Sequence, residues 1–385
     1  MMKLRVVLQS CTSLILFLKL ARADESELTL RQLNVIFRHG DRMPETFPKR
    51  FPNDPNMHDT YHPMGSGGLT NEGKLRLYRL GELLRRKYDT FLGPEYVEGD
   101  LYAISSSLAR TKMSLQLVLA ALYPPSLLPR KSRWHEFLDW QPIPTHYYDF
   151  RNDQFFNRDK CQEYIEELAR VWNSSDVRRK LEGYESFLEE LRLGAGKTTR
   201  ITLDDVLILH NNLSIEKKLN MSMRPWMIDA LRDARLGEMR RLYYEIRGYD
   251  NKLRRLADGT LVRQMNNDMV RRSNESSKYP RKVTLYSGHD KNLIGVMQAL
   301  KIYDSHFPEF GSALIFELLA SMDGQHHVKI LYHLGIPEVT KTLVIPGCES
   351  PCPLARYLNL TKSVEISDEE TSCEIRSDNY FADSD

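Results

Sequence analysis

The sequence predicts an α/β protein, with a mixed, mainly parallel sheet flanked by helices and a smaller, mainly α-helical domain inserted into it. Two stretches, 24–148 and 257–376, alternate short apolar runs typical of buried strands with amphipathic segments at helical spacing. The stretch between them, 149–256, is dense in charged residues and has few strand-like runs. We therefore assign the first two stretches to one α/β domain and the third to a helical insertion, and treat 377–385 as a polar tail.

The α/β part alternates strands and helices along the chain. The expected strands are apolar runs and lie at 28–37, 101–105, 282–287, 312–319 and 327–333. The expected helices have apolar residues at helical spacing and lie at 70–91, 107–122 and 292–300. The first of these helices is expected to bury a face with Leu75, Tyr78, Leu83, Leu84 and Phe91 on or near it.

Residues 1–23 have the layout of a signal peptide. Lys3 and Arg5 form a basic start, an apolar run follows, and Ala21-Arg22-Ala23 provides a small-x-small cleavage site. The apolar run is too short to favour the alternative, a membrane anchor. We therefore expect a secreted protein that is cleaved after Ala23.

Two further features are typical of an exported protein. Apart from Cys11 in the expected signal peptide, the chain has four cysteines, an even number that suggests two disulfide bonds. The sequence alone leaves three pairings open among Cys161, Cys348, Cys352 and Cys373. Sequons predict N-glycosylation at Asn173, Asn212, Asn220, Asn274 and Asn359.

The charge balance argues against some classes of partner. The chain has 54 Lys and Arg against 52 Asp and Glu, and four of the basic residues lie in 1–23. A nearly neutral chain gives no electrostatic reason to expect binding to nucleic acid or to an anionic membrane. The pair Cys348 and Cys352 has no second Cys or His pair at metal-ligand spacing, so we expect neither a metal nor another cofactor.

Three of the expected strands are each followed by polar side chains. They are Arg38, His39 and Arg42 after 28–37, Arg110 after 101–105, and His289 and Asp290 after 282–287. In open α/β sheets, ligands bind outside the carboxyl ends of the strands, where helix N-termini supply backbone donors for an anion. Each residue alone is more often an ordinary core or surface residue, but together they predict one anion-binding site.

This set of side chains has what the hydrolysis of a phosphate monoester requires. The planar fork of arginine matches phosphate geometry, so three arginines suit a phosphate dianion. The neutral imidazole of His39 can attack phosphorus and form a covalent intermediate. Asp290 can protonate the leaving alkoxide. A neighbouring phosphate dianion raises the pKa of such a carboxyl while arginines oppose the rise, so we expect an acidic optimum.

On these motifs the chain resembles the histidine acid phosphatases. These form the branch of the histidine phosphatase superfamily that includes the prostatic and lysosomal enzymes and the secreted acid phosphatases of insects, venom forms among them. The matching motifs cover nearly the whole mature chain and lie at 38–44, 69–73, 110–111, 121–125, 140–144, 286–290 and 346–348.

The resemblance implies a role for each residue of the set. His39 is the phosphorylated nucleophile, Asp290 is the proton donor, and the phosphate is bound by Arg38, Arg42, Arg110 and His289. It also implies the disulfides Cys161–Cys373 and Cys348–Cys352. Trp140 and His146 match a dimer contact of vertebrate relatives, so a homodimer is expected, with simple packing of these side chains as an equal alternative.

The chain departs from the family pattern at positions that border the pocket. A cysteine pair found in many relatives is absent near His210 and at Ser312, and Ala109 and Lys291 stand where aspartate and threonine are common. These changes leave the substrate open within small-molecule phosphate monoesters, including phytate, lipid phosphates and nucleotides. The loop 45–68 is not basic enough to favour a hexaphosphate.

A secreted binding protein that keeps the fold without turnover is the alternative from a different class. It predicts the loss of His39, Asp290 or one of the arginines, and none of them is lost.

Overall fold

The computed structural model describes residues 28–45, 51–274, 278, 281–371 and 373. The expected signal peptide, 1–23, and the expected polar tail, 377–385, lie outside these residues.

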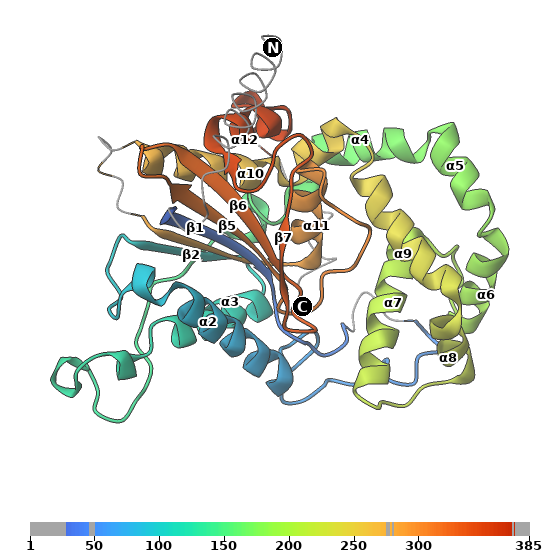
Figure 1. Cartoon of the computed structure of the whole chain (residues 1–385). Helices are drawn as coiled ribbons and strands as arrows, with labels where there is room; N and C mark the ends of the chain where they lie inside the picture. Colours follow the sequence, from blue (N-terminus) through green and yellow to red (C-terminus); the bar gives the residue numbers. More distant parts are fainter. Residues whose placement is uncertain (1–27, 46–50, 275–277, 279–280, 372, 374–385) are drawn as a thin grey trace, which may run out of the picture.

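One mixed sheet forms the centre of the molecule (Figure 1). Along the sheet, its strands are β3 (His146–Tyr147), β2 (Leu101–Ser105), β4 (Val283–Gly288), β1 (Thr29–Arg38), β5 (Ala313–Ala320), β6 (His326–His333) and β7 (Thr340–Leu343). The short β8 (Cys352–Pro353) also pairs with β6. The expected α/β fold with a mixed sheet is confirmed.

The sheet is less parallel than the sequence suggested. β3, β2, β4 and β1 run parallel to one another, but every pairing from β1 onward through β5, β6 and β7 is antiparallel. Only 321–325 separate β5 from β6, and a connection this short permits an antiparallel pair alone.

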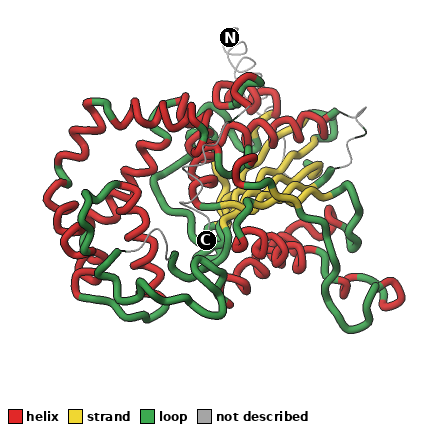
Figure 2. The backbone as a smooth tube through the Cα atoms, turned by 180° about the vertical axis from the view of Figure 1, so that it is seen from behind, coloured by secondary structure: helices red, strands yellow, loops and turns green. Residues whose placement is uncertain are grey.

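Helices cover both faces of the sheet (Figures 1 and 2). α2 (Asn71–Leu92) and α3 (Ala109–Leu122) pack on one face, where Leu33, Val35 and Phe37 of β1 meet them in one core cluster. α10 (Asn251–Ser273) and α11 (Asp290–Ala299) cover the other face, where Ile36 points. α12 (Leu354–Thr361) contacts β6 on this side. Because both faces are buried, β1 is apolar on both sides along its second half.

The buried face of α2 matches the expected one in part, because Leu84 is buried and Leu83 and Phe91 pack against the core. Leu77, Leu80, Leu84 and Tyr88 face the core, whereas Leu75 is 49 % exposed. The apolar residues of this helix cover more than one face, and the sequence pattern did not show which of them the sheet would bury. The start of the helix was correctly placed, because the Thr70 hydroxyl accepts a hydrogen bond from Gly73 N and caps it.

The segment between β3 and β4 supplies a group of helices beside the sheet, seen in green and yellow in Figure 1. They are α4 (Gln162–Trp172), α5 (Ser175–Glu182), α6 (Glu185–Ala195), α7 (Leu203–Lys218), α8 (Pro225–Arg232) and α9 (Ala234–Arg247). The domain boundary drawn at residue 256 falls inside α10, which runs from this group back to β1. The division into two domains stays a prediction.

Short 3₁₀ helices occupy several of the connections. They are Pro125–Leu127, Arg130–Ser132, Phe150–Asn152, Arg158–Lys160, Lys362–Val364 and Glu369–Thr371. No helix in the described ranges is long and apolar enough to cross a membrane.

Both expected disulfide bonds are present. Cys161, directly before α4, is bonded to Cys373 with a Cα–Cα distance of 5.5 Å. Cys348 is bonded to Cys352 with a Cα–Cα distance of 5.6 Å. The first bond ties the helical group to the C-terminal segment.

Four of the five expected glycosylation sites have exposed side chains, Asn173, Asn220, Asn274 and Asn359. Asn212 is only 5 % exposed. Its amide nitrogen donates to the Glu45 carbonyl at 2.8 Å, and its amide oxygen accepts from Glu45 N at 3.1 Å. A glycan on Asn212 would require this contact to break, and glycosylation at this sequon stays a prediction that the fold disfavours.

Candidate active site

A cleft lies at the carboxyl ends of β1 and β4, beside the N-terminus of α3. Its lining encloses about 1240 Å³ including solvent-open space. All six residues expected at the site line it: Arg38, His39, Arg42, Arg110, His289 and Asp290. The helical group supplies part of the opposite wall through Asp204, Leu207 and Ile208 of α7 and Tyr243 of α9.

The loop that follows β1 is fixed by the helices packed against it. Gly40 N donates to the Ser114 hydroxyl at 3.2 Å, and Thr70 N donates to the Asp41 carbonyl at 2.9 Å. The Asp41 carboxylate binds Arg76 of α2 and Lys218 of α7, each at 2.6 Å. His39, which precedes these residues, is therefore held on a rigid support.

His39 is buried, with 3 % of its surface exposed. Its Nδ1 lies 2.8 Å from the Gly40 carbonyl. A carbonyl can only accept, so Nδ1 carries the proton and Nε2 keeps its lone pair. Burial lowers the pKa of His39 well below its usual range, and Arg110, His289 and Arg38 lower it further. The His39 imidazole therefore remains neutral under acidic conditions, the state in which its Nε2 lone pair is available to a nucleophilic role.

Arg38, the last residue of β1, is directed by three contacts. Its Nη1 donates to the Pro308 carbonyl at 2.7 Å, and its Nη2 lies 3.0 Å from Asp290 Oδ2. The guanidinium stacks on the Phe310 ring, 4.0 Å from its centroid. Its buried Nε has no hydrogen-bond partner among the described residues. A buried donor in this state is costly unless a ligand satisfies it.

The other two arginines approach the same point from different elements. Arg42 follows β1 and donates through Nη1 to the Met43 carbonyl at 2.9 Å. Burial lowers the pKa of Arg42 to about 10, which leaves it cationic at acidic and neutral pH. Arg110 lies in the first turn of α3, with Nε 3.2 Å from His39 Nε2. A phosphate attacked by Nε2 would therefore meet this guanidinium directly.

His289 and Asp290 come from the junction of β4 and α11. His289 Nε2 lies 3.0 Å from the Ser106 hydroxyl, and the rings of His289 and His39 meet edge to face at 5.4 Å. Burial acts to raise the pKa of Asp290, but Arg38, Arg240 and His289 outweigh it and hold the pKa below its usual range. The carboxyl is therefore ionised when no phosphate is bound.

A buried chain of polar groups supports this junction from behind. Asn292 accepts from His289 N at 3.1 Å and donates to the Asp258 carboxylate, also at 3.1 Å. Asp258 lies on α10 and is 5 % exposed, and its burial raises the pKa of this carboxyl to about 7. These contacts fix the first turn of α11, which carries Asp290.

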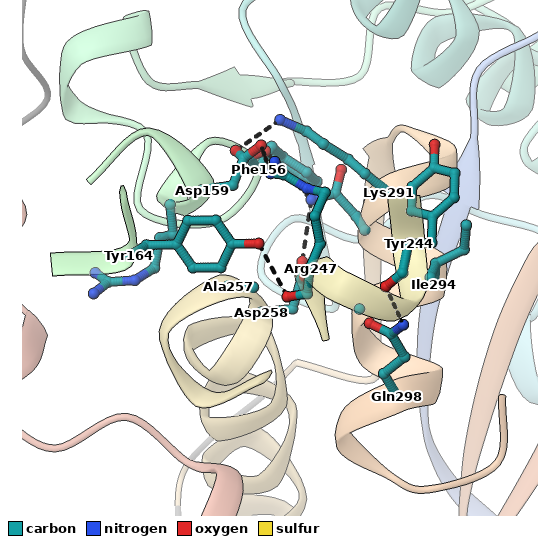
Figure 3. Close-up of a pocket in the computed structure, with 13 residues that line it drawn as sticks. Phe156, Asp159, Tyr164, Tyr244, Arg247, Ala257, Asp258, Lys291, Ile294 and Gln298 are labelled. Atoms are coloured by element: carbon teal, nitrogen blue, oxygen red, sulfur yellow. Dashed lines mark hydrogen bonds and ion pairs between the residues drawn. The ribbon is translucent and has the colours of Figure 1, made fainter. Parts of the chain in front are cut away.

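Lys291 belongs to a second set of charges, between the cleft and a smaller pocket beside it (Figure 3). Its ammonium lies 2.8 Å from Asp159 Oδ1, and Arg247 reaches Asp159 Oδ2 at 2.6 Å. Burial acts to raise the pKa of Asp159, but the two cations hold it well below its usual range. The positive charge of Lys291 is thus largely neutralised.

Several residues of the site were missed by sequence reasoning. Glu45 and Asp159 line the cleft, while Asn292, Asp258 and Arg240 act from behind it. None belongs to a quoted motif. Glu45 and Asn292 each lie three positions from a site residue they contact, Arg42 and His289, and this spacing was the one local signal. Asp159, Asp258 and Arg240 are brought to the site by the fold alone. Within the described residues, no group of three or more His, Cys, Asp or Glu side chains is placed to hold a metal ion.

The chain has an α/β fold with a mixed sheet, and three arginines, two histidines and a carboxyl lie where its strands end. Together the fold and the site define a phosphatase. Residues 29–333 match the model of the histidine phosphatase superfamily (branch 2), and the chain belongs to that superfamily. The resemblance stated from the motifs is confirmed.

Known proteins agree in sequence and in fold. The chain is 39 % identical to a venom acid phosphatase of Apis mellifera over 347 residues, covering 90 % of this chain and 88 % of that protein. It is 31 % identical to the prostatic acid phosphatase of Bos taurus, covering 90 % and 88 %. The phytase of Citrobacter braakii superposes with a TM-score of 0.64 at 17 % identity, over 89 % of this chain and 99 % of that one. At this identity the last likeness concerns the fold alone.

Proposed function

We propose that the protein is a secreted acid phosphatase that hydrolyses phosphate monoesters through a phosphohistidine on His39. The single observation that carries the proposal is the state of that imidazole. It is buried and neutral, its Nδ1 proton is bound to Gly40, and its Nε2 lies against Arg110. An imidazole in this state can attack an anion that the surrounding arginines hold.

The first half of the reaction transfers the phosphoryl group to the enzyme. His39 Nε2 attacks phosphorus, the bond from phosphorus to the ester oxygen breaks, and the leaving oxygen takes a proton from Asp290. Arg38, Arg42, Arg110 and His289 hold the three phosphate oxygens, and the unpaired Nε of Arg38 is one donor available for them. A bound dianion offsets the field of the arginines and raises the pKa of Asp290, which then holds the proton at acidic pH.

The second half returns the enzyme to its starting state. Asp290, now ionised, takes a proton from a water molecule whose oxygen attacks phosphorus. The bond from phosphorus to Nε2 breaks, inorganic phosphate leaves, and His39 is again neutral. Neither half needs a metal or another cofactor.

Secretion is the second part of the proposal. It is supported by the signal-peptide layout of 1–23, by two disulfide bonds, and by a relative that is named a venom acid phosphatase. The expected substrates are small-molecule phosphate monoesters, and binding to nucleic acid or membrane is not expected.

A projecting segment supports the proposal of a homodimer. Between α3 and β3 the chain extends away from the sheet (Figure 1, lower left), and β3 is an edge strand. The exposed aromatic side chains here are Trp134, Phe137 and Trp140 of the projecting segment and Tyr147 of β3. Exposed apolar side chains gathered in this way are typical of an interface. Analytical ultracentrifugation should show a dimer that Trp140→Ala weakens, and a monomer at every concentration would contradict it.

The activity is tested on p-nitrophenyl phosphate across pH. The parent protein should hydrolyse it under acidic conditions, and His39→Ala should be inactive. His135→Ala, at an exposed histidine that does not line the cleft, should match the parent. An inactive parent, or an active His39→Ala variant, would overturn the proposal.

A further inference from the structure

A carboxylate lies against the arginines of the phosphate site. Glu45 Oε1 is 3.0 Å from Arg110 Nη2, and Oε2 is 3.8 Å from Arg42 Nη2. The side chain is 20 % exposed and lines the cleft. A negative charge beside two groups expected to bind a phosphate is not needed for the reaction proposed above, and it therefore requires a separate explanation.

The position of Glu45 is set by its backbone. Asn212 of α7 bonds both the N–H and the carbonyl of Glu45, at 3.1 Å and 2.8 Å. Asn212 is buried, and an amide that bonds a backbone at two points fixes its orientation as well as its place. Gly67 packs on the other side, where a Cβ would lie 3.2 Å from Glu45 Cγ and 3.1 Å from Arg110 Nη1. The carboxylate is therefore held at the cleft by the fold.

The rest of the cleft wall offers little for a second anion. Lys291 is already neutralised by Asp159, at 2.8 Å. Asp204 adds another carboxylate, and Lys160 is the remaining lysine of the lining. Leu108, Leu207 and Ile208 add apolar surface to this lining. This apolar surface can contact the carbon skeleton of an uncharged alcohol but offers nothing to a second phosphate group.

We infer that Glu45 is a specificity-determining residue that restricts the site to monoesters with a single phosphate group. Its carboxylate balances part of the charge of Arg42 and Arg110, so these arginines accommodate one phosphate dianion. A second phosphate on the same substrate meets the carboxylate at short range, in a cleft where water screens charge less than in bulk. Phosphate esters of apolar alcohols are then favoured over bisphosphates and polyphosphates. The inference rests on the proposed function.

The test compares a matched pair of substrates, fructose 6-phosphate and fructose 1,6-bisphosphate. Phosphate release gives kcat/KM for each, with the parent protein, Glu45→Gln and Glu45→Ala. Removing the charge should raise the ratio of bisphosphate to monophosphate kcat/KM about tenfold, since one charge–charge interaction in a partly screened cleft has this size. High salt should raise the parent's ratio toward that of the variants, because screening weakens the repulsion.

A matched control is Glu189→Gln, which removes an exposed carboxylate paired with Arg192 on α6. Its ratio should equal that of the parent. If Glu45→Gln and Glu45→Ala keep the parent's ratio, or raise kcat/KM equally for both substrates, the inference is wrong. In that case an active parent and an inactive His39→Ala would still support the proposed function. An inactive parent or an active His39→Ala would overturn both.

Discussion

In the proposed mechanism, the Gly40 carbonyl decides which nitrogen of His39 reacts. By accepting from Nδ1 it leaves the Nε2 lone pair facing Arg110, and the burial of the ring keeps that lone pair unprotonated. The proton for the leaving group must then come from a second residue, and Asp290 is the carboxyl of the site bound to Arg38. The proposal thus takes the nucleophile and the proton donor from side chains that follow two different strands, β1 and β4.

The role of Asp290 gives a prediction about leaving groups. Asp290→Asn keeps the shape of the side chain but cannot donate a carboxyl proton. We expect kcat/KM, which reports the first half of the reaction, to fall about 10²- to 10⁴-fold on an alkyl ester such as glycerol 2-phosphate. The fall in kcat/KM on p-nitrophenyl phosphate should be much smaller, because its phenolate leaves without a proton. Steady-state kcat/KM values on the two substrates check this, and equal losses of kcat/KM on both would show that Asp290 is not the donor.

At this scale the sequence predicted some residues and could not predict others. His39, Arg42 and Asp290 follow strand ends within short motifs, so their neighbourhood could be foreseen. Glu45 and Asn212 are 167 positions apart, and Asn212 lies in a sequon that pointed to a glycan instead. Only the packing of α7 against the cleft shows what these two residues do.

The site also depends on how closely two elements approach. The loop after β1 and the start of α2 are in backbone contact at Gly40 and Gly73. A Cβ on Gly40 would overlap the Gly73 carbonyl, and a Cβ on Gly73 would overlap the Asp41 backbone. Glycine at these two positions lets α2 pack directly beneath the residues that follow His39.

Gly73→Ala should therefore lower both stability and activity. The added methyl would push the loop away from α2, at a cost of about 2 kcal/mol or more, and would shift His39. The control is Gly183→Ala at the end of α5, where a Cβ meets nothing within 4 Å and φ is −68°. Thermal melts and kcat/KM should show losses in the first variant alone. An unaffected Gly73→Ala would contradict the role given to this contact.

Elements were easier to predict than their orientation. The strands and helices around the site lie within a few residues of their expected positions, because their apolar runs end at clear turn signals. The buried face of α2 was predicted in part: Leu84 is buried and Leu83 and Phe91 pack against the core, whereas Leu75 is exposed and Leu77 is buried in its place. Leu75 and Leu77 are both apolar, and only the packed sheet decides between them. The sheet was expected to be mainly parallel, but the pairings of β1, β5, β6 and β7 are antiparallel. The short β5–β6 connection would have indicated an antiparallel pair.

On the scale of the whole molecule, buried carboxyls link stability to pH. Burial raises the pKa of Asp258 to about 7, while its unfolded value is about 3.9. Between these two values the folded chain binds a proton that the unfolded chain has lost. The stabilisation is complete below about pH 4 and is lost as pH rises through about 7. Asp258 therefore makes the folded state more stable at acidic pH than at neutral pH.

Asp258→Asn should flatten that dependence. The amide mimics the neutral acid, and its oxygen can still accept from Asn292. Melting temperatures between about pH 4 and about pH 7 should fall less in the variant than in the parent. Asp229→Asn, at an exposed position on α8, serves as the control and should follow the parent. A variant that loses stability as steeply as the parent would contradict the assignment.

The two disulfide bonds should contribute unequally to the stability of the molecule. Cys161–Cys373 joins positions 212 apart, and Cys348–Cys352 joins positions 4 apart. Chain entropy gives about 5 kcal/mol for the first and about 2 kcal/mol for the second. Cys161→Ser with Cys373→Ser should lower the melting temperature more than Cys348→Ser with Cys352→Ser. Equal losses, or the reverse order, would show that loop length does not set their contribution.

The covalent intermediate on His39 can be observed directly. The protein is mixed with a ³²P-labelled monoester, quenched in alkali, where phosphohistidine survives, and digested for peptide mapping. We predict that the label lies on the peptide that contains His39, and that His39→Ala takes up none. Label on a different residue, or full turnover of substrate with no labelled enzyme, would contradict the account.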